Sequence, residues 1–134
     1  SNDIKFFFKY RYSFPSNKLT YIRNGIPCVD VSTKIRNDTF VIGSSGRLFP
    51  VKDYGLMVEI ASILKKYGIQ FVLAGEGPER EKIETLINLH GLQDSFRLLG
   101  HLNDMTLFYQ EIHLYLSTSI HEGIPMTILE AMVH

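Results

Sequence analysis

From Thr39 onward, short apolar runs alternate with stretches in which apolar residues recur every three or four positions. The short runs predict strands over 39–43, 70–74, 96–99 and 112–116, because each is bounded by glycine or polar residues. The periodic stretches between them predict amphipathic helices. Strands and helices that alternate in this way indicate right-handed βαβ units on a parallel sheet. The pattern therefore predicts an α/β fold, a Rossmann-like open parallel sheet with flanking helices.

The helices of these units have recognisable ends. Pro78 suits the first turn of the second helix, where no amide partner is needed, and Gly68 and Gly91 suit the left-handed position after a helix. Further helices are expected over 104–110 and from Pro125 to the end of the sequence. The first helix is indicated by the three- or four-residue spacing of Leu56, Ile60, Leu64 and Tyr67, and Ile83, Ile87 and His90 mark one face of the second.

The unusual residue choices gather in the loops that follow the predicted strands. These loops span 44–52, 75–78, 100–103 and 117–125. The carboxyl ends of parallel strands share one edge of a sheet, and ligands of open α/β sheets bind at that edge. The concentration of these residues predicts a nucleotide-type site there.

Residues 1–38 have a different pattern. Residues 4–12 are aromatic and basic, 13–17 are typical of a turn, 19–22 of a strand, and Asn24-Gly25 of a second turn. The aromatic and basic stretch has two interpretations. One is a helix on a membrane surface, which would make the parent protein peripherally membrane-associated. The other, which we favour, is a helix that packs on a part of the protein outside this chain.

The composition is that of a soluble globular domain, with 45% hydrophobic and 21% charged residues among 134. The 14 basic residues cancel the 14 acidic ones, which argues against a nucleic-acid partner bound by charge. Cys28 is the single cysteine, so an internal disulfide is excluded and a packing role is expected. No apolar run approaches the roughly 18 residues of a membrane span, and no signal peptide is recognisable. We predict a cytoplasmic protein.

Arg47 and Lys52 share a glycine-containing loop after the first predicted strand. Two cations that reach a diphosphate from different directions could hold it, arginine as a planar fork and lysine as a point charge. Gly46 would let the backbone approach closely. The alternative is a pair of solvated surface cations.

Glu122 and Glu130 lie on either side of Pro125. Because proline fixes the start of the last helix, Glu122 lies in the loop just before its N-terminus and Glu130 lies within the helix. The two carboxylates could flank one elongated ligand. The amide groups expected to face an anion are those of Gly123, Ile124 and Met126. The alternative is a capping acid and a solvated helix residue, but Glu130 has apolar neighbours, where an unpaired acid is costly.

Other motifs predict less. The turn Gly75-Glu76-Gly77-Pro78 lacks phosphate-loop spacing, so we interpret it as a tight turn that passes near a ligand. His101 and His121 are lone histidines at loop edges, for which a structural role is the commoner one. No two His, Cys, Asp or Glu residues have metal-ligand spacing, so no metal site is predicted. No serine-hydrolase arrangement is present.

Residues 119–132 read S-I-H-E-G-I-P-M-T-I-L-E-A-M. This run resembles the signature of the glycogen-synthase-like group of retaining GT-B glycosyltransferases, the glycosyl transferases group 1. Weaker similarities follow the family's order at 17–26, 46–53, 74–78 and 96–100. The resemblance covers about residues 15–134.

The resemblance implies the donor-binding half of an enzyme that transfers a sugar from a nucleotide-diphosphate sugar to an acceptor, as in glycan or polysaccharide biosynthesis. Arg47 and Lys52 would hold the diphosphate, Glu130 the ribose hydroxyls and Glu122 the transferred sugar. The base would lie by Gly75, His101 and Leu102, and the distal phosphate or sugar by Gly123, Ile124, Pro125 and Met126. The family needs no obligatory metal cofactor.

Two positions depart from the family pattern, because Thr118 stands where many members have proline and Asp53 where many have glycine. Neither departure removes an expected contacting group. The resemblance also implies two Rossmann-like domains with the site between them. Residues 1–16 would be a remnant of the N-terminal acceptor domain or a linker, and 17–134 an incomplete nucleotide-sugar domain. A truncated piece of this kind is expected to be inactive by itself.

Two other classes stay open. A non-catalytic nucleotide- or phosphate-binding module of the receiver type needs a phosphorylatable aspartate in an acidic cluster at a strand end, and the four predicted strand ends lack one. A GT-B-fold nucleotide-sugar epimerase would share the architecture, but its histidine-based signature is not recognisable around Glu122.

Overall fold

The structure is a computed structural model of the chain, and it describes residues 2–20, 22, 25–26, 39–123 and 125–134. Three predictions concern residues outside this set. They are the packing role of Cys28, the turn at Asn24-Gly25 and the amide of Ile124.

The described residues form a four-stranded parallel sheet in the order β3-β2-β1-β4. Its strands are β1 (Val41–Ser45), β2 (Gln70–Ala74), β3 (Phe96–Gly100) and β4 (Leu114–Tyr115). The chain runs outward from β1 through β2 to β3 and then returns to pair β4 with the other side of β1. The direction of winding therefore reverses between β1 and β4, which is where open α/β sheets form their ligand crevice.

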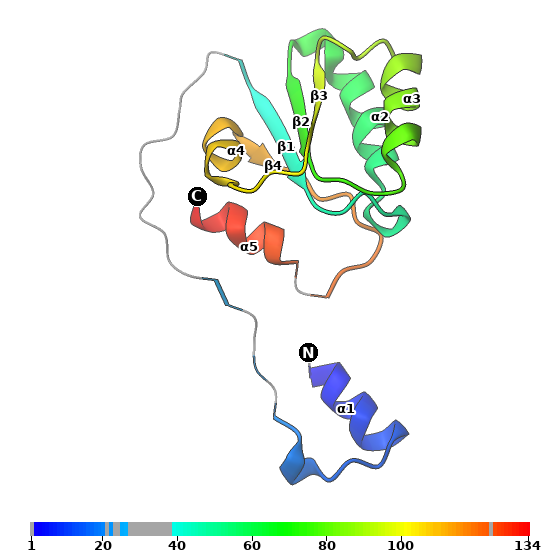
Figure 1. Cartoon of the computed structure of the whole chain (residues 1–134), viewed down its shortest axis with the longest axis vertical. Coiled ribbons are helices and arrows are strands. Elements are labelled where there is room, and N and C mark those ends of the chain that lie inside the picture. Colours follow the sequence, from blue (N-terminus) through cyan, green and yellow to red (C-terminus); the bar gives the residue numbers. More distant parts are fainter. Residues whose placement is uncertain (1, 21, 23–24, 27–38, 124) are drawn as a thin grey trace.

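Helices cover both faces of the sheet (Figure 1). One face carries α2 (Tyr54–Leu64) and α3 (Arg80–Leu89), and the other carries α4 (Thr106–Glu111) and α5 (Met126–Val133). A parallel sheet requires this two-sided cover because both of its faces are apolar. The helix α1 (Asn2–Arg11) precedes these layers and is drawn apart from them in Figure 1. The predicted α/β fold class, a Rossmann-like parallel sheet with flanking helices, is confirmed.

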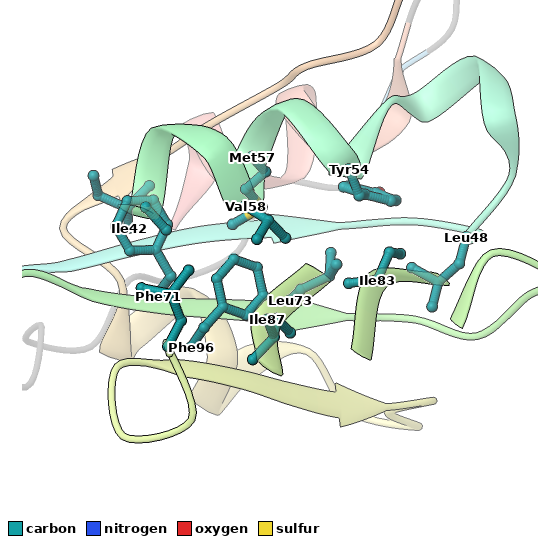
Figure 2. Close-up of a cluster of buried hydrophobic side chains, with 12 residues drawn as sticks. Ile42, Leu48, Tyr54, Met57, Val58, Phe71, Leu73, Ile83, Ile87 and Phe96 are labelled. Carbon is teal, nitrogen blue, oxygen red and sulfur yellow. The ribbon is translucent and has the colours of Figure 1, made fainter. Parts of the chain in front are cut away.

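Successive residues of the strands serve two separate hydrophobic cores. Phe71 and Leu73 of β2 belong to the core under α2 and α3, whereas Val72 belongs to the core under α4. Figure 2 shows the first core, in which Met57 and Val58 of α2 are directed at the sheet. Full burial of one such side chain stabilises the fold by about 1.5–3 kcal/mol, whereas an exposed ion pair contributes about 0.2–1 kcal/mol. Burial therefore holds the fold together.

Two predicted strand boundaries are wrong. The first strand lies at Val41–Ser45 rather than 39–43, because pairing with β2 begins at Val41 while Phe40 remains 45% exposed. The run 112–116 contributes only Leu114–Tyr115 as a strand. The predicted strand over 70–74 has the observed bounds, and the one over 96–99 extends by one residue to Gly100.

The apolar residues whose spacing indicated α2 are not the ones that the helix buries. The buried residues are Tyr54, Met57, Val58 and Ala61. Leu56 and Tyr67 are exposed, and Ile60 and Leu64 pack at the margin of the core. The helix is apolar on almost every side, so periodicity did not distinguish its faces. Gly68 does end the helical region in the left-handed conformation, after a 3₁₀ turn.

The other helices follow the predictions more closely. In α3, Ile83 and Ile87 are buried as expected, but His90 is exposed because it is the C-terminal cap. Pro78 lies before α3, which begins at Arg80. Likewise α4 begins at Thr106 rather than 104, since the Asp104 carboxylate accepts the Thr106 amide at 2.8 Å.

The first part of the chain matches its predictions in part. The aromatic and basic stretch is helical as α1, and its rings contact one another, as in the stacked pair Phe6 and Tyr10. Among the described residues of 19–22, none belongs to a strand. The last helix begins at Met126, with Pro125 as its N-terminal cap.

Candidate functional site

A cavity of about 420 Å³ opens at the carboxyl edge of the sheet. This volume is within the usual range for small-molecule sites. The predicted site residues in its wall are Gly46, Arg47, Gly75, His101, Leu102 and Glu130. They come from the loops after β1, β2 and β3 and from α5, so segments far apart in the sequence converge on one space.

Sequence reasoning missed the other residues of the wall, which are Ser45, Ala74, Glu76, Met105 and Thr127. Most of them are direct neighbours of predicted residues. Ser45 and Ala74 are the last residues of their strands, so their place at the carboxyl edge could have been inferred from correct strand ends. No sequence signal distinguishes Met105 or Thr127 from ordinary helix-end residues.

The loops around the cavity are joined backbone to backbone. The Gly46 amide donates to the Ala74 carbonyl at 2.9 Å, and the Gly75 amide donates to the Gly100 carbonyl at 2.7 Å. Gly75 has φ +143°, and a Cβ added there would lie 1.9 Å from the Gly46 carbonyl oxygen. Only glycine permits this approach. The close contact fixes the loops that carry Arg47 and Glu76 at the cavity.

Arg47 is the exposed cation of this wall. Its guanidinium carbon lies 5.4 Å from the centre of the Phe49 ring, a cation–π arrangement. Within the described part of the chain, Arg47 takes part in no ion pair. Its hydrogen-bond donors are therefore not engaged by a carboxylate of these residues.

Lys52 forms an ion pair with Glu122, and the Ser119 hydroxyl donates to the same carboxylate oxygen at 2.8 Å. The hydrogen bond from Lys52, followed by the one from Ser119, holds the pKa of Glu122 below its usual value. Lys52 also lies beside the cavity wall, since a Cβ on Gly46 would be 3.7 Å from its Nζ. Arg47 and Lys52 thus both lie near Gly46, on the loop that follows β1.

The loop after β4 is tied to the loop after β1 at two further points. The Thr118 hydroxyl donates to the Lys52 carbonyl at 2.9 Å, and the Ile120 amide donates to the Val51 carbonyl at 2.9 Å. A proline at 118 could not make the first bond. The departure from the family pattern at Thr118 therefore adds a contact next to Lys52.

Glu130 is held by a buried tyrosine that sequence reasoning missed. The Tyr109 hydroxyl donates to Glu130 Oε2 at 2.9 Å. Burial raises the pKa of Tyr109 above its usual value, so its hydroxyl keeps its proton at neutral pH. A second hydroxyl, that of Tyr115, donates to the Ser45 carbonyl at 3.0 Å. A signal existed, because a buried tyrosine usually needs a partner for its hydroxyl.

The two predicted carboxylates have different surroundings. Glu130 lines the cavity, whereas Glu122 pairs with Lys52 outside the lining. Pro125 and Met126 form the start of α5 and Gly123 is exposed in the preceding loop. The first amides of α5 have no acceptor within the helix. Ile124 lies outside the described residues.

The described residues include neither a cluster of metal ligands nor a helix that could span a membrane. Nowhere in these ranges do three His, Cys, Asp or Glu side chains gather as metal ligands do. None of the described helices has the length and apolar character needed to cross a bilayer.

Comparison with known proteins gives a consistent result. Residues 28–134 match the family described as Glycosyl transferases group 1. An uncharacterized glycosyltransferase of Haemophilus influenzae is 26% identical over 125 residues, which cover 92% of this chain. The O-antigen biosynthesis glycosyltransferase WclY of Escherichia coli is 25% identical over 132 residues, covering 91% of this chain. These matches cover only 35% and 37% of the two relatives, so the chain spans little more than a third of their length.

A crystal structure of a mutant of TarM from S. aureus, in complex with Fondaparinux, alpha-GlcNAc-glycerol and UDP, has a similar fold. The TM-score is 0.80 at 26% identity, and the match covers 92% of this chain and 25% of that one.

Proposed function

The chain belongs to the glycosyl transferases group 1 family, and from this premise we propose that it binds the nucleotide-diphosphate sugar of a retaining glycosyl transfer reaction. Its homologues include enzymes of polysaccharide biosynthesis, and its α/β Rossmann-like fold is that of its GT-B structural neighbours. The donor, the retention of anomeric configuration and the roles of single residues are our proposal.

The observation that carries the proposal is the distribution of charge around the cavity. Arg47 supplies a cation on the β1 side and Glu130 a carboxylate on the α5 side of one cavity at the carboxyl edge of the sheet. A nucleoside diphosphate has matching features, since phosphate oxygens accept hydrogen bonds and a ribose diol donates them. A single ligand of this class could accept hydrogen bonds from Arg47 and donate them to Glu130.

In the proposed arrangement, Arg47 and Lys52 hold the diphosphate together. They would stabilise the negative charge that develops on the departing nucleotide during transfer. Lys52 now pairs with Glu122, so a phosphate would share its ammonium with that carboxylate. Glu122 would then lie beside the transferred sugar, and the free amides at the start of α5 would face the distal phosphate.

The base would lie against the part of the wall formed by Gly75, His101 and Leu102, with Met105 adding apolar contact. The TarM structure contains UDP, and we therefore propose UDP as the first nucleotide to test. The proposed reaction needs no metal ion, a prediction that activity after treatment with a chelator would test.

The chain spans about a third of the length of its relatives, and we propose that the acceptor binds to another part of a longer protein. Residues 17–134 would then form the donor domain, and 1–16 a link to the acceptor domain or a remnant of it. The inactivity of this piece alone, its cytoplasmic location and a peripheral membrane contact of the parent protein stay predictions.

Titration of the full-length protein with UDP tests the donor proposal. A buried hydrogen bond to a charged group contributes about 1.5–3 kcal/mol, so Glu130→Gln should weaken UDP binding roughly ten- to hundredfold. Glu122→Gln should leave UDP binding near that of the wild type but lower the rate of UDP release from a panel of UDP-sugars. Glu81→Gln, an exposed change on α3, is the matched control and should alter neither value.

Two results would contradict the proposal. If Glu122→Gln lost UDP affinity while Glu130→Gln kept it, the assigned roles would be reversed. If wild-type protein bound none of UDP, GDP and ADP in calorimetry, the donor function itself would be wrong.

A further inference from the structure

We propose that Tyr109 is a positioning residue for donor binding: its buried hydroxyl holds the Glu130 carboxylate at the cavity wall, oriented to accept a ribose diol. The inference rests on the proposed function and adds to it a residue outside the 119–132 signature.

The geometry brings together two helices on the same face of the sheet. Tyr109 lies in α4 and is 2% exposed, and Glu130 lies in α5 at the edge of the cavity. The Tyr109 hydroxyl has two oxygens within reach on α5, at 2.9 Å from Glu130 Oε2 and at 3.5 Å from the Thr127 carbonyl. The shorter bond goes to the carboxylate. A phenol has a single proton to donate, and this proton is directed at the group that lines the cavity.

The tyrosine is itself held in place from the strand side. The Ser45 side chain lies close enough to the Tyr109 hydroxyl to lower its pKa by hydrogen bonding, against the effect of burial. Ser45 in turn is fixed by Tyr115, whose hydroxyl accepts the Ser45 amide at 3.2 Å and donates to the Ser45 carbonyl at 3.0 Å. The hydroxyl groups thus form a connected network from the end of β1 to α5. Such networks rigidify the groups that they join.

A fixed carboxylate is useful for binding because glutamate is a long side chain with considerable rotamer freedom. Ordering that side chain during binding opposes affinity, whereas a side chain ordered beforehand does not carry this penalty. When Tyr109 engages one oxygen of Glu130, the orientation of the other oxygen is also set. The ribose hydroxyls would then meet an acceptor that is already in position.

The test compares UDP with 2′,3′-dideoxy-UDP, which lacks the diol, by calorimetry on the full-length protein. Wild-type protein should bind UDP more tightly, and Glu130→Gln should bring the two affinities close together. Tyr109→Phe removes the bond that orients the Glu130 carboxylate but leaves the carboxylate itself, so it should lower the UDP to dideoxy-UDP affinity ratio by less than Glu130→Gln does, roughly two- to tenfold. It should do so by weakening UDP alone, which a purely structural role would not produce.

Two further variants keep the test decisive. Tyr67→Phe removes the hydroxyl of a residue that is 65% exposed after α2 and is not part of the cavity wall, so it should preserve the wild-type ratio. If Tyr109→Phe lowers the melting temperature too far for titration, Glu130→Asp serves instead. It keeps the charge but withdraws the carboxylate from Tyr109, and the ratio should fall.

The failures of the two proposals can be told apart. Equal weakening of both nucleotides by Tyr109→Phe, or a wild-type ratio in Tyr109→Phe or Glu130→Asp, would overturn the role of Tyr109 while leaving the donor site intact. A ratio near one in wild-type protein would overturn the ribose assignment and the inference together. No binding of UDP, GDP or ADP by wild-type protein would overturn the donor function.

Discussion

At the scale of single residues, hydrogen bonds determine the charge of the site. Glu122 accepts from both Lys52 and Ser119, and these bonds stabilise its ionised form. The side chains of the Lys52–Glu122 pair are 20% and 27% exposed. An ion pair so close to water contributes modestly to the stability of the fold. Its main consequence is that Lys52 is already paired with a carboxylate when a ligand arrives.

Lys52→Met should raise the pKa of Glu122 back toward its usual value of 4.5, because the largest stabilising hydrogen bond is lost. Carbon NMR measures this shift by following the chemical shift of the Glu122 side-chain carboxyl carbon as the pH is changed. Lys82→Met is the control, since Lys82 pairs with Glu79 on a different surface. An unchanged midpoint in Lys52→Met would contradict the ion pair.

The same pKa gives the sign of the dependence of stability on pH. The pKa of Glu122 is lower in the folded than in the unfolded protein, so its contribution is fully present above the unfolded value. The contribution decreases as the pH falls below 4.5 and through the lower folded pKa. In Lys52→Met this acid-side loss of stability should become smaller, as measured by urea unfolding at several pH values.

At the scale of elements, the approach of the loops after β1 and β2 forms one side of the cavity. The approach depends on Gly75, whose position admits no side chain next to the Gly46 carbonyl. A different glycine, Gly68, has a positive φ of +70° but no atom within 4 Å of an added Cβ. Comparing alanine substitutions at the two positions therefore separates the cost of backbone strain from the cost of steric overlap.

Gly68→Ala should lower the free energy of unfolding by about 1–2 kcal/mol, the cost of a left-handed alanine. Gly75→Ala should cost about 1–3 kcal/mol more, because the backbone around Gly46 must also move. It should weaken UDP binding as well, whereas Gly68→Ala should not. Urea unfolding and calorimetry measure the two effects. Equal destabilisation by both changes would show that the close approach of the loops is unimportant.

At the scale of the whole molecule, a hydrophobic core lies on each face of the sheet, whereas the aromatic side chains of α1 are exposed. Phe6, Phe7 and Tyr10 are 56%, 53% and 70% exposed on this helix. Exposed apolar patches tend to drive association. The basic residues Lys9 and Arg11 in its last turn keep the helix partly polar.

We expect the 134-residue chain to associate in sedimentation velocity, with the fraction of associated protein rising with concentration. The double change Phe7→Ser and Tyr10→Ser should shift the distribution toward monomer. Leu89→Ser removes a single side chain that is 76% exposed on α3 and should leave association unchanged. A monodisperse monomer of the unmodified chain at all concentrations would contradict this expectation.

Much of the fold class and part of the site could be predicted because their signals are local. The strand Gln70–Ala74 was predicted with its observed bounds, since its apolar run ends at glycine. The position of Pro125 located the start of α5 within one residue. The run 119–132 was sufficient to indicate the family that residues 28–134 match. Each of these inferences needs only neighbouring residues.

The contacts between distant residues were decided by the tertiary structure alone. Lys52 meets Glu122 across 70 positions, and Tyr109 meets Glu130 across 21. These pairs form because the order β3-β2-β1-β4 returns the chain to the far side of β1. The inward face of α2 depends on the same packing, because that helix is apolar on almost every side. Hydrophobic periodicity records the spacing of residues within one element, whereas strand order and helix rotation are set by the packing of elements against each other.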